Sequence, residues 1–186
     1  MKALPVDVNI DLANPIKEDT STVILPSKFI AVGKVNEGDL KVYIHQNAYK
    51  EISEYSSSDI SKELGSILIG DYLQSNGVTY VLISDFIEAK FTKSSSSTLT
   101  FTHETWNDIH CEHENNFPNK RIVGWQHTHP NYGVFLSSYD LFIQENFFNL
   151  DFQIAYVVDP IRKTSGFFQN QNGKVEKLSG FYIYNE

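Results

Sequence analysis

A short stretch in the second half of the chain constrains the local fold more than any other. It contains His127-Thr-His129-Pro130 and, after a gap, Ser137-Ser-Tyr-Asp140 followed by an apolar run. Because Pro130 cannot donate to a β-ladder, a strand that carries the two histidines should end just after His129. A serine and an aspartate three residues apart are typical of a capped helix N-terminus. The stretch therefore predicts a strand, a loop and then a helix.

The same spacing favours a metal site. On a strand, His127 and His129 would place both imidazoles on one face, about 7 Å apart at the backbone. The Asp140 carboxylate could approach the same ion from the helix. Two histidine nitrogens, one carboxylate oxygen and an open fourth position form the ligand arrangement of catalytic zinc sites. A simple helix cap is the alternative role for Ser137 and Asp140, although capping does not exclude metal binding.

The joint pattern resembles a family signature. His127-x-His129 followed by Ser137-x-x-Asp140 is similar to His-x-His-x7-Ser-x-x-Asp, the signature of the JAMM (MPN-plus) zinc metalloproteases. All four positions of that signature are present at its spacing. The four positions together are far more specific than either pair alone.

A second segment resembles the upstream part of the same family. Glu63-Leu-Gly-Ser66-Ile-Leu-Ile-Gly70 is similar to Glu-x-x-Gly-apolar-Leu-x-Gly, and Glu63 stands where the family has its catalytic glutamate. Ser66 replaces the usual first glycine, a small-for-small departure that leaves the acid unchanged. Considered alone, Glu63 would be an exposed acid at a strand edge. Together with the downstream signature, it is predicted to be catalytic.

The resemblance implies a fold and a mechanism. The fold is α/β of the α+β type, a twisted, mixed, cytidine-deaminase-like sheet flanked by helices. One zinc ion would be held by His127, His129 and Asp140. Glu63 would take a proton from the attacking water and pass it to the leaving amine, and Ser137 would donate a hydrogen bond to the oxyanion. Helix capping and oxyanion stabilisation are thus both open roles for Ser137.

The resemblance also implies a substrate class. Family members cleave isopeptide or peptide bonds after the C-terminal Gly-Gly of ubiquitin or a ubiquitin-like protein, and others trim related prokaryotic modifiers or cell-wall peptides. We therefore expect an amide-bond hydrolase that acts on a ubiquitin-like protein or its conjugate. An extended tail could bind by strand addition beside residues 86–101 and 132–135. The alternatives are a peptidase for another amide, such as a cell-wall peptide, and a metal-free scaffold.

Neither an internal repeat nor a linker divides the chain. Strand-like runs alternate with helical segments, which indicates a mixed sheet with helices packed on it. Asn76-Gly77, between two β-rich runs, predicts a hairpin. Residues 1–37 are predicted to form an N-terminal arm or extra strands, and residues 38–186 the JAMM/MPN domain. Because the chain ends soon after the last predicted strand, a small stand-alone, prokaryotic-type member is expected.

The composition limits the classes of partner and the cellular location that we expect for this chain. The formal net charge is −8 and nothing resembles a basic stripe, so nucleic-acid binding is not expected. An acidic surface is compatible with a basic protein partner or simply with solubility. No apolar run reaches the roughly 18 residues of a membrane span, and the N-terminus lacks a signal-peptide core, so cytoplasmic localisation is expected. The single cysteine, Cys111, excludes an intrachain disulfide and a multi-cysteine zinc site.

Overall fold

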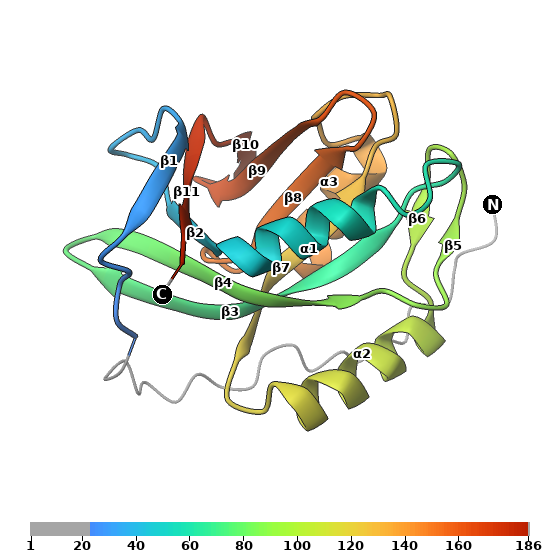
Figure 1. Ribbon diagram of the computed structural model, residues 1–186, viewed down its shortest axis with the longest axis horizontal. Helices are drawn as coiled ribbons and strands as arrows, with labels where there is room; N and C mark the ends of the chain where they lie inside the picture. The colour runs from blue at the N-terminus through green and yellow to red at the C-terminus, as the bar shows by residue number, and fades with distance from the viewer. Residues whose placement is uncertain (1–22, 186) are drawn as a thin grey trace.

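The centre of the fold is a long β-hairpin in a computed structural model that describes residues 23–185 (Figure 1). β3 (Gly65–Ser75) and β4 (Val78–Glu88) pair antiparallel along their length. Asn76 and Gly77 connect them with φ angles of 51° and 74°. A two-residue loop with positive φ at both positions matches the twist of the strands, and Asn-Gly is its preferred sequence. The predicted hairpin is therefore confirmed.

The hairpin lies inside a mixed nine-stranded sheet. Its other strands and those of a separate two-stranded ribbon are β1 (Phe29–Gly33), β2 (Lys41–His45), β5 (Lys93–Ser94), β6 (Leu99–Thr100), β7 (Arg121–Thr128), β8 (Ile154–Asp159), β9 (Thr164–Gln171), β10 (Lys174–Lys177) and β11 (Gly180–Tyr184). The strand order in the large sheet is β1-β11-β2-β4-β3-β7-β8-β9-β10, and β5 pairs with β6 in the ribbon. The pairs β11–β2, β2–β4 and β7–β8 are parallel, so the sheet is mixed as predicted.

Three helices cover the two faces of this sheet (Figure 1). α1 (Gln46–Ser56) packs on one face, and α2 (His103–Asn116) and α3 (Ser138–Phe147) pack on the other. Side chains alternate along β3, so Leu68 joins the core under α1 while Ile67 joins the core under α2 and α3. The α+β fold with a mixed sheet flanked by helices is thus confirmed.

β7 lies beside β3 and leads into the predicted strand–loop–helix segment. It runs antiparallel to β3 and parallel to β8. The strand ends at Thr128, one residue before His129, and α3 begins with Ser137 as its N-cap. In the β3–β7 ladder Gly65 pairs with His127. The end of β7 and the start of β3 therefore meet at one edge of the sheet.

The N-terminal part of the described chain extends the sheet at its other side. β1 pairs antiparallel with β11 and forms the outermost strand there. The rest of the predicted N-terminal arm, residues 1–22, lies outside the described residues. Within residues 23–185, the helices are all too short or too polar to cross a membrane.

Gly70 and Gly77 provide a matched test of the hairpin geometry. A Cβ atom on Gly70 would overlap the carbonyl group of Leu82, whereas a Cβ atom on Gly77 would meet nothing and suffer only from the positive φ. We expect Gly70→Ala to lower the free energy of unfolding by about 3 kcal/mol and Gly77→Ala by about 1 kcal/mol. Urea unfolding measures both losses, and equal losses would contradict the close approach at Gly70.

Candidate metal centre

Three buried side chains converge where β7 ends and α3 begins. The Nε2 atoms of His127 and His129 lie 3.1 Å apart. The Oδ2 atom of Asp140 lies 3.5 Å from the first nitrogen and 3.4 Å from the second. Three donors bound to one tetrahedral zinc ion at about 2.0–2.1 Å would be separated by about 3.3 Å. The donor set therefore has the spacing of one face of a zinc tetrahedron, and it could hold a metal ion.

Each histidine is oriented by contacts of its own. The Trp125 ring stacks on His127 with centroids 4.4 Å apart and planes 11° apart, and Trp125 Nε1 donates to Gln144 in α3 at 2.8 Å. The Nδ1 atom of His129 lies 3.2 Å from the Gly133 carbonyl oxygen. An imidazole that donates through Nδ1 presents Nε2 as an acceptor, which is the form that binds metal.

Asp140 is fixed by the helix cap that the sequence predicts. Ser137 Oγ accepts from the Asp140 backbone N–H at 3.2 Å, and Asp140 Oδ2 accepts from the Ser137 N–H at 2.7 Å. The oxygen that faces the histidines is thus the same oxygen that closes the capping box. Burial alone would raise the pKa of Asp140, but hydrogen bonds with His127 and His129 outweigh burial and hold this pKa well below its ordinary value. Asp140 is therefore ionised in this site.

Glu63 lies beside the donor set, just before the first residue of β3. Its Oε1 atom is 3.7 Å from His129 Nε2, and the residue is 3% exposed. Two backbone anchors hold the segment: the Glu63 N–H donates to the Ser95 carbonyl at 2.7 Å, and Leu64 exchanges hydrogen bonds with Thr128. Burial raises the pKa of Glu63, the neighbouring His129 lowers it and the Asp140 carboxylate raises it, and the net result is a pKa of about 7. A carboxyl group with such a pKa can both accept and donate a proton near neutrality.

The sequence matches one family over the central hairpin, the three helices and the candidate site. The match covers residues 37–151, and the family is described as JAB1/Mov34/MPN/PAD-1 ubiquitin protease. The chain belongs to this family. Its relatives include the 26S proteasome regulatory subunit RPN11 of Eremothecium gossypii, which is 26% identical over an alignment of 141 residues that covers 67% of this chain and 40% of that protein.

Two further relatives cover a similar part of this chain. The ubiquitin carboxyl-terminal hydrolase RPN11 of Saccharomyces cerevisiae is 24% identical over 67% of this chain and 40% of its own length. The COP9 signalosome complex subunit 5 of Candida albicans is 28% identical over 78% of this chain and 23% of its own length. The chain thus spans less than half the length of these relatives.

A solved structure supports the fold alone. The solution structure of a Desulfitobacterium hafniense protein superimposes with a TM-score of 0.55 at 10% identity, covering 78% of this chain and 94% of that chain. At this identity the likeness concerns the path of the backbone and carries no information about the site.

The serine that departs from the family pattern has a partner of its own. Ser66 Oγ donates to Gln126 Oε1 at 2.8 Å, and Gln126 Nε2 donates to Ser56 Oγ at 3.2 Å. All three side chains are fully buried, so the chain of hydrogen bonds joins β3, β7 and α1 across the core. A glycine at this position would leave the Gln126 amide oxygen without this donor.

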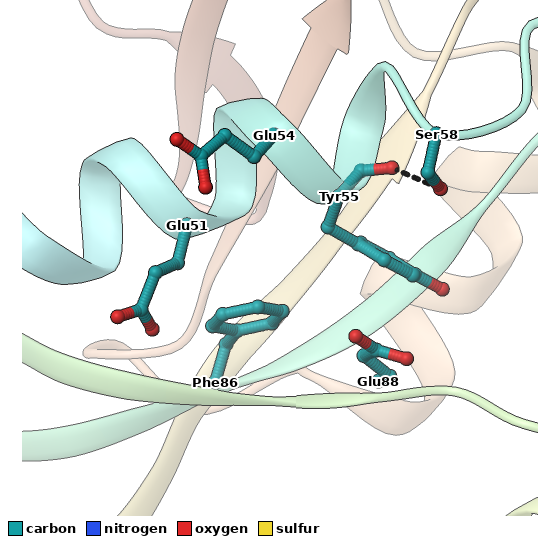
Figure 2. A pocket seen from close by; sticks show the side chains of 6 residues that line it. All are labelled: Glu51, Glu54, Tyr55, Ser58, Phe86 and Glu88. Atoms are coloured by element: carbon teal, nitrogen blue, oxygen red, sulfur yellow. Dashed lines mark hydrogen bonds between the residues drawn. The ribbon is translucent and has the colours of Figure 1, made fainter.

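A groove of about 440 Å³ lies between α1 and β4 (Figure 2). It is lined by Glu51, Glu54, Tyr55, Ser58, Phe86 and Glu88. The hydroxyl of Tyr55 donates to the Gly65 carbonyl at 3.0 Å, two residues beyond Glu63, so the groove adjoins the start of β3. Its aromatic and carboxylate side chains would attract a positively charged peptide more strongly than a negatively charged one.

Two contributors to the site escaped prediction from the sequence. Thr128 holds the segment that carries Glu63, and Asp159 contacts the loop that follows His129. Both residues act on backbone atoms of segments distant in the sequence, and no local motif marks such contacts.

Thr128 offers a direct test of how the Glu63 segment is held. Thr128→Val removes the acceptor of the half-buried Leu64 N–H and should lower the free energy of unfolding by about 1 kcal/mol. Thr128→Ser keeps the hydroxyl and serves as the control, with a smaller loss from the missing methyl group. Chemical denaturation measures both. Equal losses in the two variants would show that the hydrogen bond to Leu64 contributes nothing.

Proposed function

We propose that this chain is a zinc-dependent amide-bond hydrolase, an isopeptidase or peptidase of the JAMM type. The observation that carries the proposal is the buried carboxyl group of Glu63 beside the His127–His129–Asp140 donor set. A ligand triangle alone would suit a structural ion. A proton acceptor with a raised pKa next to an open coordination position is the arrangement that hydrolysis needs.

The residues divide the chemistry among them. When bound, zinc supplies a Lewis acid that polarises a carbonyl group and acidifies a water molecule. Glu63 accepts the proton of the attacking water and later delivers it to the leaving amine. Ser137 Oγ accepts from the Asp140 N–H, which leaves its own proton free to donate to the oxyanion. The burial of the site excludes bulk water and strengthens each of these interactions.

The substrate proposed is the C-terminal tail of a ubiquitin-like protein or its conjugate. The names of the RPN11 relatives, a ubiquitin carboxyl-terminal hydrolase among them, support this class. The β5–β6 ribbon supports it too, because the Ser95 carbonyl that follows β5 binds the backbone of Glu63. An extended tail that pairs with the ribbon would reach the scissile position next to Glu63.

The test is a cleavage screen with zinc-loaded protein. We expect hydrolysis of fusions in which a Gly-Gly tail of a ubiquitin-like protein precedes a reporter, and no hydrolysis of cell-wall muropeptides. The reverse pattern would assign a different amide to the same chemistry. Failure to bind zinc, together with inactivity on both substrate sets, would instead indicate a scaffold.

Two substitutions separate metal binding from proton transfer. Glu63→Gln should keep zinc but lower hydrolysis by roughly 10²–10⁴-fold, because the amide cannot accept a proton. His127→Ala should lose both zinc and hydrolysis, and removal of zinc by a chelator should have the same effect on the unmodified chain. Metal analysis and turnover measure the two properties. Full activity in Glu63→Gln would contradict its role.

Ser137 can be tested against a matched helix cap. Ser137→Ala should cost about 1 kcal/mol of stability as a lost N-cap and slow turnover by roughly 10²–10³-fold as a lost oxyanion donor. Thr102 caps α2 with the same capping-box geometry, and that helix carries none of the proposed site residues. Thr102→Ala should therefore show a similar loss of stability with unchanged turnover. An unchanged turnover in Ser137→Ala would leave Ser137 as a cap only.

A further inference from the structure

A buried carboxylate at the end of β8 gathers backbone donors from two turns. Asp159 is 0% exposed. Its Oδ1 atom accepts from the N–H groups of Asn131, Ile161 and Arg162, each at 3.0 Å. Its Oδ2 atom accepts from the Gly133 N–H at 2.7 Å. Burial would raise the pKa of Asp159, but these four backbone hydrogen bonds outweigh burial and hold this pKa below its ordinary value, so the group is an anion.

The four contacts of Asp159 fall into a local pair and a distant pair. Contacts of Oδ1 with Ile161 and Arg162 are those of an ordinary turn closed by an aspartate side chain, which any strand end could use. The contacts of Oδ1 with Asn131 and of Oδ2 with Gly133 reach another segment, 28 and 26 residues away in the sequence. A role limited to the local turn would not require these two distant contacts.

The contact of Asp159 with Gly133 leads directly to the metal centre. The carbonyl oxygen of Gly133 lies 3.2 Å from His129 Nδ1. The same residue thus donates its N–H to Asp159 and faces His129 with its C=O. The intervening turn is closed by the Tyr132 N–H on the His129 carbonyl at 3.1 Å, with Pro130 at its second position and Asn131 at a φ of 68°.

Arg162 holds the same turn from outside. Its Nη2 atom donates to the Asn131 carbonyl at 2.7 Å, and its Nε atom lies 3.5 Å from Asp159 Oδ2. Gly133 itself has a φ of 90°, which few other residues adopt without strain. The turn is therefore set by contacts on both sides, and its geometry fixes the direction of the Gly133 carbonyl.

We propose that Asp159 is a positioning residue of the zinc site. Its carboxylate fixes Gly133, and the Gly133 carbonyl holds the His129 ring with Nε2 directed at the metal position. The inference rests on the proposed function, since it needs zinc to bind at His129. Partners that orient metal-binding histidines in this way typically change metal affinity by about 10–100-fold when they are removed.

The substitution that isolates this role is Asp159→Asn. The amide oxygen can keep the three contacts of Oδ1, but the amide NH₂ would then face the Gly133 N–H, donor against donor. We expect the zinc dissociation constant to increase about tenfold, the lower end of the range for such partners. We also expect the His129 Nδ1–H signal of the zinc-loaded, ¹⁵N-histidine-labelled protein to exchange faster with solvent.

A control on the same strand separates positioning from general destabilisation. Tyr156 is buried in β8, and its hydroxyl donates to Ser165 Oγ at 3.0 Å, away from the turn after His129. Tyr156→Phe removes a buried hydrogen bond and should therefore lower stability. It should change zinc affinity less than about twofold, because the lost hydrogen bond does not hold the turn that positions His129. A zinc affinity in Asp159→Asn equal to that of the unmodified chain, or an equal loss in Tyr156→Phe, would overturn the inference.

A measurement on the unmodified chain decides the matter if Asp159→Asn does not fold. Coupling is reciprocal, so zinc binding should slow amide hydrogen exchange at Asn131 and Gly133, the turn residues that donate to Asp159. Unchanged exchange rates at both amides would overturn the inference. A chain that binds no zinc at all would overturn the proposed function as well, whereas normal zinc binding without this coupling would overturn the positioning role alone.

Discussion

The pairing of the start of β3 with the end of β7 is the constraint on which the site depends. It places Gly65 opposite His127 and joins Leu64 to Thr128 through two hydrogen bonds. A slip of one residue would turn every side chain of the strand to the opposite face. Glu63 would then point away from the histidines. The register is thus as important as the identity of the ligands.

The site also shows how a fold can bury charge. An isolated carboxylate in the protein interior is very unfavourable, so buried acids require donors. Asp140 receives the Ser137 N–H and faces two imidazoles, and Asp159 receives four backbone N–H groups. Glu63 is different, because burial dominates and its pKa is raised to about 7. Buried acids with opposite shifts are typical of sites where one acid binds and another moves protons.

The sequence predicted the parts of this protein that depend on local chemistry. Pro130, the Ser137 cap and the Asn76-Gly77 turn each act within a few residues, and the strand, helix and hairpin that they predict are present. The approach of Glu63 to His129 was expected only from the family resemblance, because no spacing rule relates residues so far apart. Thr128, Asp159 and the partner of Ser66 were beyond prediction for the same reason: each contacts an element that only the sheet order brings near.

The shared oxygen of Asp140 would link the proposed metal binding to the stability of α3. Oδ2 closes the helix cap and faces the two histidines at once. Each donor is therefore held by the protein itself: His127 by Trp125, His129 by Gly133, and Asp140 by the first turn of its helix. A site assembled in this way does not have to order its ligands when an ion arrives. Under the proposed function, an ion would enter and leave a chain that is already folded, and the metal content would follow the surrounding solution rather than the folding history.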